Sequence, residues 1–234
     1  MTTGGGSGGP AQLALDLPVR EGMAREDFFV TGANRAALRI IESWPEQFPR
    51  KPVLALCGPP GCGKTHLAQI WRQRTGALLA APQDILTENV PALLSQGHLV
   101  IEDMPGKALD EVALFHLVNL ARETQGAVLF TGRDFPARWP IALPDLRSRL
   151  KAALVARIEE PDDALLRAVL VKLFTDRQIR VNERAINYML TRMERSLAAA
   201  RELVRTIDAR ALAEKAEVTR AFISKVMRQG HEGG

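Results

Sequence analysis

Eight consecutive residues have the types and spacing needed to hold phosphate. They match the pattern G-x-x-x-x-G-K-[ST] and read Gly58-Pro59-Pro60-Gly61-Cys62-Gly63-Lys64-Thr65. The glycines let backbone N–H groups converge on β- and γ-phosphate oxygens, the lysine adds a positive charge, and the threonine offers a hydroxyl to Mg²⁺. The alternative is an ordinary Gly/Pro turn, which accounts less well for eight matching positions between a strand pattern and a helix pattern. The sequence therefore predicts a nucleoside diphosphate or triphosphate site, and we include His66, the next residue, among its binding residues.

Two acidic residues, Glu102 and Asp103, follow the short apolar run Leu99-Val100-Ile101. One carboxylate can hold Mg²⁺ and the other can orient a water molecule, so we assign Glu102 to the metal and Asp103 to catalysis. Acids at a strand end also occur in solvated turns. These acids, however, lie about 40 residues after the phosphate loop, where nucleotide-hydrolysing folds carry such a pair. Because Asp normally precedes the second acid, the reversed order leaves open whether the chain hydrolyses nucleotide itself.

The segments around these residues alternate between two periodicities. Apolar runs predict strands over 53–57, 77–80, 99–101, 127–131 and 153–158, and helical spacing predicts helices over 36–41, 65–75 and 109–124. This alternation predicts an α/β fold with a parallel, doubly wound sheet and the nucleotide at the carboxyl ends of the strands. From Pro161 onward only helical patterns remain, over 165–174, 182–193, 197–212 and 219–227. They predict a small C-terminal lid that is all helical.

Composition limits the class of protein. The chain has 234 residues, 46% of them apolar, and a formal net charge of +4, which is only a weak indication of nucleic-acid binding. Cys57 and Cys62 are its only cysteines, so a disulfide framework and a four-ligand zinc site are excluded, and a reduced, cytoplasmic setting is expected. No window holds 18 uninterrupted apolar residues and the amino terminus lacks a secretory pattern, so we expect no membrane association.

The first residues form a segment of different composition. Residues 1–10 are rich in Gly, Ser and Thr, and Gln12-Leu13-Ala14-Leu15-Asp16-Leu17 follows with apolar residues at alternate positions. Such alternation suits an extended peptide that docks in an apolar groove of a partner, or else a first strand that covers the core. We expect a disordered tail over 1–22, an α/β nucleotide-binding domain over 23–160, the lid over 161–228 and a disordered end over 229–234.

With these features the chain resembles the AAA+ family of P-loop NTPases, and within it the DnaA clade. The segment 27–35 is similar to the FxxFVxGxxN motif of that clade, which implies that Asn34 lies near the adenine. The segment 128–136 is similar to the sensor-1 strand and assigns a catalytic role to Thr131, and 143–150 is similar to the box that ends in Ser-Arg. By that match Arg149 is an arginine finger that serves the nucleotide of a neighbouring subunit; the alternative is a surface arginine near a helix end.

The resemblance also bears on partners. An initiator of this clade continues into a DNA-reading domain, which this chain lacks after the lid, so we expect no sequence-specific DNA binding. A DnaA-like core preceded by a Gln-Leu-x-Leu-x-Leu peptide resembles the Hda-type regulatory inactivators of DnaA. In that family the peptide docks on the β sliding clamp, which implies that Gln12, Leu13, Leu15 and Leu17 bind the clamp. The implied function is negative regulation of DNA replication initiation, through stimulation of ATP hydrolysis by DnaA. A homodimer is a further partner that we consider.

Some assignments stay open at this stage. The sensor-2 position of the family falls on Ala198, and we consider Arg195 and Arg201 as substitutes that contact the nucleotide. The resemblance suggests ADP as the bound nucleotide, with ATP as the alternative. A helicase loader of the DnaC type and a stand-alone AAA+ ATPase share the core and remain alternative functions.

Overall fold

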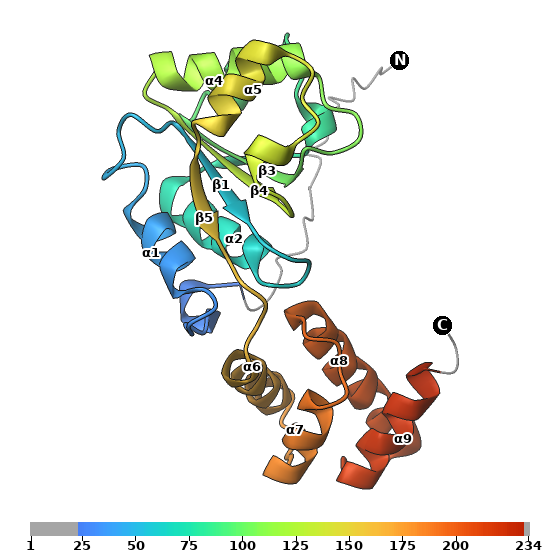
Figure 1. Ribbon diagram of the computed structural model, residues 1–234. Coiled ribbons are helices and arrows are strands. Elements are labelled where there is room, and N and C mark those ends of the chain that lie inside the picture. Colours follow the sequence, from blue (N-terminus) through green and yellow to red (C-terminus); the bar gives the residue numbers. More distant parts are fainter. Residues whose placement is uncertain (1–22, 232–234) are drawn as a thin grey trace, which may run out of the picture.

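The computed structural model describes residues 23–231, which form an α/β body and a smaller helical part (Figure 1). The helices of the body are η1 (Arg25–Asp27), α1 (Arg35–Ser43), α2 (Lys64–Thr75), η2 (Pro82–Asp84), α3 (Val90–Leu93), α4 (Glu111–Glu123), η3 (Pro136–Arg138) and α5 (Pro144–Lys151). Its strands are β1 (Val53–Cys57), β2 (Leu78–Ala80), β3 (His98–Met104), β4 (Ala127–Gly132) and β5 (Leu154–Arg157). The lid contains α6 (Asp163–Asp176), α7 (Glu183–Leu190), α8 (Leu197–Glu214) and α9 (Arg220–His231).

The strands form one five-stranded sheet in the order β2-β3-β4-β1-β5, and each pairing is parallel. Strand β1, which pairs with β4 and β5, is buried along its whole length, as expected for a parallel strand that is covered on both faces. Its residues alternate between two cores: Val53, Ala55 and Cys57 face one side, and Leu54 and Leu56 face the other. The predicted parallel, doubly wound α/β fold is confirmed.

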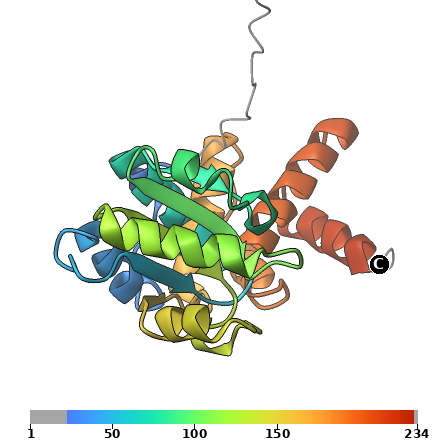
Figure 2. The ribbon, with the colours of Figure 1, turned by 90° about the horizontal axis from the view of Figure 1, so that it is seen from above.

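Each face of the sheet carries its own helices (Figures 1 and 2). On one face α4 and α5 pack through Leu114, Leu117 and Leu146. On the other, α1 and α2 pack through apolar residues that include Trp71. Since every strand enters from the same edge, the loops that leave the strands gather at the opposite edge. The phosphate loop lies there, at the end of β1.

The lid helices begin at side-chain caps that the sequence pattern contains. The side chains of Asp162, Asn182 and Ser196 accept hydrogen bonds from the N–H groups of Leu165, Ala185 and Ala199 at 2.7–3.0 Å. The apolar stripes of α6 to α9 meet in a separate core, as predicted.

Two boundaries differ from the expectations. Strand β3 does not end at Ile101 but continues through a bulge to Met104, so Glu102 and Asp103 lie within it. Helix α9 continues to His231, past the predicted boundary at 228. Within residues 23–231 no helix combines the length and the apolar character needed to cross a membrane.

Candidate nucleotide-binding site

The phosphate loop connects β1 to α2 and depends on its glycines. Gly61 and Gly63 have φ angles of 68° and 108°, in the left-handed region that other residues rarely adopt. A Cβ on Gly58 would collide with the carbonyl oxygen of Ile158, so glycine alone fits there. The loop thereby turns directly into the amino end of α2, where unpaired N–H groups and the helix dipole favour an anion.

Lys64 holds its ammonium group at this loop. Its Nζ donates to the carbonyl oxygens of Gly58 and Pro59, each at 2.8 Å, and the side chain is 9% exposed. Phosphate oxygens would compete with these two carbonyls for the same charge. Burial raises the pKa of the nearby Cys57 thiol to about 12 and also raises that of Cys62, which disfavours the thiolate form of both.

The two acids of β3 occupy different environments. Asp103 has a φ of 59°, and its N–H donates to the hydroxyl oxygen of Thr131 at 3.1 Å, so the expected catalytic residues Asp103 and Thr131 contact each other. Glu102 lies two residues after Val100, which packs on the α2 face of the sheet. Its Oε1 is buried and has no hydrogen-bond partner.

This unpartnered oxygen bears on the expected Mg²⁺. A buried carboxylate oxygen without a donor is costly unless a cation meets it. Thr65, in the first turn of α2, adds a hydroxyl oxygen, and Mg²⁺ prefers such hard oxygen ligands. Glu102 and Thr65 therefore fit the metal that the sequence assigns to them.

Residues 24–34 form a segment beside the loop, and Asn34 and His66 hold it in place. Asn34 is 1% exposed; its Nδ2 donates to the carbonyl of Phe29 at 2.8 Å, and its Oδ1 accepts from the N–H of Thr31 at 3.0 Å. The Nε2 of His66 donates to the carbonyl of Ala24 at 2.9 Å. Burial lowers the pKa of His66. Both side chains thus hold the 24–34 segment beside the loop, and their contact with the nucleotide stays a prediction.

The lid touches the phosphate loop through the start of α8. The N–H of Leu197 donates to the carbonyl of Gly61 at 2.8 Å. A Cβ on Gly61 would lie 2.7 Å from Cβ of Ser196 and 3.4 Å from Cβ of Ala198. A second link joins Asp27 to Lys172 of α6 at 3.0 Å. Body and lid therefore meet at the loop.

The candidates for sensor 2 lie at different places around this contact. Ala198 adjoins Gly61, as described. Arg195 donates to Oδ1 of Asp163 at 2.6 Å and to the carbonyl of Pro161 at 3.1 Å, so its guanidinium is held by the start of α6. Arg201 lies one turn after Ala198, where its charge contributes to lowering the pKa of His66. Of the two arginines, Arg201 is the one whose charge acts on a residue of α2, His66.

Arg149 lies at the other edge of the sheet, in the last turn of α5. Its guanidinium stacks over the ring of Phe115, with 5.1 Å between Cζ and the ring centroid. It lines a pocket of about 240 Å³ together with Arg50, Lys51 and Arg122, and no acidic residue lines that pocket. Val53, the first residue of β1, also lines it. Since a strand rises about 3.3 Å per residue, this pocket is roughly 13 Å along β1 from the phosphate loop.

Some of these residues were missed by sequence reasoning. Arg50 and Lys51 precede β1 and Arg122 lies in α4; neither segment carries a motif, and only the fold brings them to Arg149. The capping pattern at Ser196 was the one available signal that α8 begins where it can meet the loop. The proposed clamp-binding residues Gln12, Leu13, Leu15 and Leu17 lie outside the described residues.

Comparisons with known proteins agree with this geometry. No family model matches the chain. An uncharacterised protein of Haemophilus influenzae is 25% identical over 190 residues, which cover 76% of this chain and 82% of that protein. The chromosomal replication initiator protein DnaA of Nostoc punctiforme is 29% identical over 188 residues, or 69% of this chain and 40% of the initiator. The chain thus spans about two fifths of the length of this DnaA relative.

Solved structures show the same fold. Domain III of DnaA from Thermotoga maritima aligns with a TM-score of 0.75 at 19% identity, over 91% of this chain and 98% of the domain. The branch migration motor RuvB of the same organism aligns with a TM-score of 0.68 at 16% identity, over 88% of this chain and 71% of RuvB. DnaA from Aquifex aeolicus, solved with AMPPCP bound, aligns with a TM-score of 0.69 at 16% identity, over 88% of this chain and 69% of that one. The fold is that of AAA+ ATPase domains such as those of DnaA and RuvB, and the sequence is similar to part of DnaA.

Proposed function

We propose that this protein is a nucleotide-bound AAA+ regulator that stimulates ATP hydrolysis by the initiator DnaA and so limits replication initiation. Its own site binds ADP or ATP through the loop Gly58–Thr65, with Lys64 on the phosphates. Mg²⁺, when bound, is held by Thr65 and Glu102 and neutralises phosphate charge. Bound nucleotide acts mainly as a structural ligand that joins the loop to the lid.

The observation that carries the proposal is the surroundings of Arg149. The pocket it lines with Arg50, Lys51 and Arg122 contains no acid to neutralise it and lies at the sheet edge away from the chain's own phosphate loop. An arginine in this position is too far away to serve its own nucleotide. The cluster is instead suited to the phosphates of a nucleotide that a second protein presents, where a fixed positive charge stabilises the charge that develops during transfer.

The choice of partners rests on homology and on sequence. Homology to the DnaA AAA+ domain makes DnaA the partner that could present ATP to Arg149, since AAA+ domains of one clade can pair with one another. The peptide Gln12–Leu17 supplies the proposed anchor on the β sliding clamp. We expect Leu15→Ala/Leu17→Ala to abolish co-elution with the clamp while leaving the unfolding transition unchanged.

The test is hydrolysis of labelled ATP prebound to DnaA, with DNA-loaded clamp and with this protein present or absent. Arg149→Ala should reduce stimulation about 10³-fold or more, while nucleotide binding by the variant and its clamp binding persist. Arg147→Ala on the same helix is the matched control, because Arg147 is exposed and does not line the pocket. Stimulation by Arg149→Ala at the wild-type level would refute the role of the finger.

A second candidate function is ATP hydrolysis by the chain itself, which the unpartnered Oε1 of Glu102 favours. Turnover by the protein alone, lost in Glu102→Gln, would support it. If the wild-type protein alone does not hydrolyse ATP, the nucleotide acts only as a structural ligand.

A further inference from the structure

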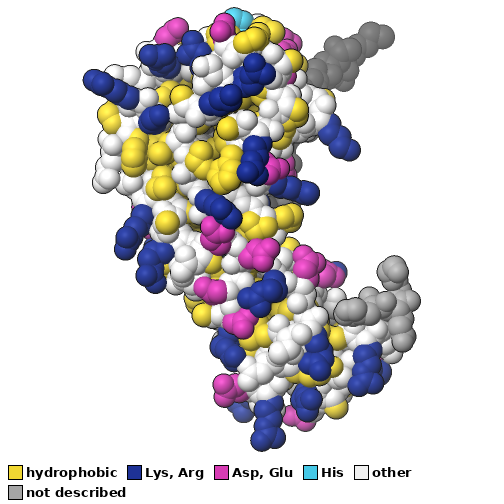
Figure 3. Space-filling model, viewed as in Figure 1, with side chains coloured by type: hydrophobic (Ala, Val, Ile, Leu, Met, Phe, Trp, Pro, Cys, Tyr) yellow, Lys and Arg dark blue, Asp and Glu magenta, His cyan; other side chains and the backbone are white. Residues whose placement is uncertain are grey.

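The lid carries the excess positive charge of the chain. Residues 161–228 contain 14 Lys and Arg against nine Asp and Glu, whereas the whole chain has a net charge of only +4. Figure 3 shows Lys and Arg side chains spread over the lid, with fewer Asp and Glu side chains among them. An excess of positive charge on one domain is consistent with a polyanionic partner.

Part of this charge lines a groove between α7 and α9. The groove has a volume of about 1020 Å³ and is lined by Tyr188, Arg192, Arg220, Ala221, Ser224, Met227 and Arg228. It contains no acidic lining residue, and within residues 23–231 none of its arginines forms an ion pair. These charges therefore remain available to an anion.

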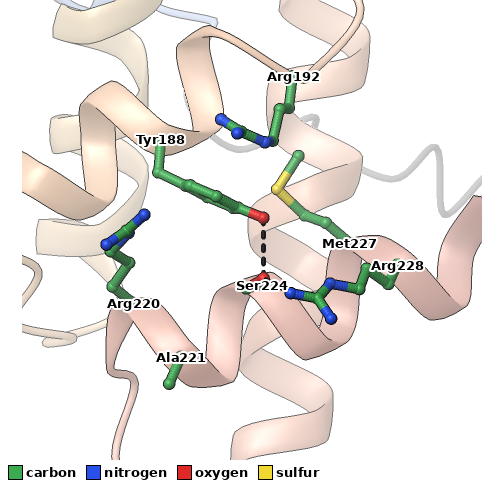
Figure 4. A pocket seen from close by; sticks show the side chains of 7 residues that line it. All are labelled: Tyr188, Arg192, Arg220, Ala221, Ser224, Met227 and Arg228. Atoms are coloured by element: carbon green, nitrogen blue, oxygen red, sulfur yellow. Dashed lines mark hydrogen bonds between the residues drawn. The ribbon is translucent and has the colours of Figure 1, made fainter.

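Local contacts hold the arginines in place. Arg192 and Arg220 lie on either side of the Tyr188 ring, with Cζ at 4.1 and 5.2 Å from its centroid (Figure 4). Arg228 donates to the hydroxyl of Ser224 at 3.3 Å, and that hydroxyl bonds the Tyr188 hydroxyl at 2.8 Å. Guanidinium groups that are already ordered lose less entropy when an oxyanion binds.

We propose that this groove binds double-stranded DNA through its phosphate backbone, without regard to sequence. Arg220 and Arg228 lie eight residues apart on one face of α9, or about 12 Å, and Arg192 faces them from the end of α7. A row of phosphates can meet several charges so spaced, whereas a single phosphate would leave most of a groove this large empty.

Two observations select duplex DNA over other polyanions. Both faces of the Tyr188 ring are covered by guanidinium groups, so the ring offers no stacking platform for the bases of a single strand. The apolar residues of α9, Phe222, Ile223 and Val226, are buried in the lid core, so α9 presents no apolar face to a lipid surface. A duplex requires neither stacking nor insertion, because its outer ridge is phosphate.

The experiment measures binding of the full chain to a short fluorescein-labelled duplex by anisotropy over a range of salt concentrations. Three phosphate contacts predict a slope of log K against log salt of about −3. Arg220→Gln/Arg228→Gln should weaken binding by about tenfold at low salt and lower the slope by about two. Arg180→Gln/Arg205→Gln removes the same charge from exposed lid positions outside the groove and should change both quantities much less.

A second variant tests the groove independently, in case the first variant does not fold. Ala221→Glu places a carboxylate in the groove at an exposed helical position and should weaken duplex binding to a similar degree. Unchanged binding by both variants, or an equal loss in the Arg180/Arg205 control, would overturn the proposal. Tighter binding of a single strand of equal length, of polyglutamate or of anionic vesicles, lost in the same variants, would assign the groove to that partner instead.

Discussion

Gly61 combines two roles that are usually separate in a phosphate loop. Its positive φ shapes the loop, and its carbonyl accepts the first hydrogen bond from α8 of the lid. The missing side chain is also what lets Ser196 approach, since any Cβ would lie 2.7 Å from that residue. A single backbone position therefore couples the shape of the nucleotide site to the position of the lid.

Replacing Gly61 with alanine should cost more than backbone strain alone. We expect Gly61→Ala to lower the free energy of unfolding by about 2–4 kcal/mol, from left-handed strain and from displacement of α8. Gly76→Ala is the matched control: Gly76 has a φ of 69°, but an added Cβ would meet no atom within 4 Å, so this variant should lose only about 1 kcal/mol. Urea unfolding of both variants measures the difference, and equal losses would contradict the coupling.

Residues with a local signature could be found from the sequence, and residues without one could not. The phosphate loop is contiguous, so its chemistry is visible in eight letters, Gly58 to Thr65. The cluster of Arg149 with Arg50 and Arg122 forms only when α4, α5 and the start of β1 pack together. Sequence reasoning placed Asn34 and His66 among the nucleotide ligands, but it did not show that their polar atoms also hold the 24–34 segment in place.

At the scale of elements, the contacts around α2 show what orders the site. The segment 24–34 contacts His66 of α2 through the hydrogen bond from His66 to Ala24 and through the edge contact of Phe28 with the His66 ring at 5.2 Å. Strand β3 gives a second case: its continuation through Asp103 depends on Thr131 of β4, a partner 28 residues away. The apolar run in the sequence ends at Ile101. The continuation of the strand could not be predicted, because a contact between residues far apart in the chain does not appear in the hydrophobic periodicity.

The buried side chain of His66, which binds the 24–34 segment to α2, predicts that stability depends on pH. Burial lowers the pKa of His66 in the folded protein below its ordinary value of 6.5, so the unfolded chain binds its proton first as pH falls. Stability contributed by neutral His66 is complete above pH 6.5 and is lost progressively below it. Nearby Arg201 and Arg25 act in the same direction, and Asp27 opposes them.

His66→Gln tests this, because glutamine can still donate to the carbonyl of Ala24 but does not titrate. Between pH 7.5 and pH 5.5, which is about one unit on either side of the ordinary histidine pKa, the wild type should lose more thermal stability than the variant. His116→Gln, on the exposed face of α4, should follow the wild type. Identical pH profiles for wild type and His66→Gln would contradict the assignment.

At the scale of the whole molecule, the described residues form a body and a lid that are joined at the nucleotide site. The body and lid each bury their own apolar residues, and their described polar links are few: the Leu197–Gly61 hydrogen bond and the Asp27–Lys172 ion pair are two that lie beside the loop. The ion pair is partly exposed and contributes little by itself. A ligand bound at the loop can therefore add substantially to the stability of this junction.

The thermal response to ADP measures that addition. ADP at about 100 times its Kd should stabilise the wild type by about 2.7 kcal/mol, a rise in Tm of roughly 5–10 °C for a chain of this size. Lys64→Ala should lose this shift because it removes the ammonium group that lies against the loop carbonyls. Lys107→Ala, an exposed lysine between β3 and α4, should keep it.

Hydrogen exchange shows where the stabilisation acts. If nucleotide joins the loop to the lid, ADP should slow exchange of the amides in the first turn of α8, where Leu197 bonds to Gly61, as well as those of the phosphate loop. Amides near Tyr188, in the far part of the lid, should respond less, because α7 is not among the elements that contact the loop. Protection confined to the body, with the start of α8 unchanged, would separate nucleotide binding from the lid and contradict the proposed role of the nucleotide as a ligand that joins the loop to the lid.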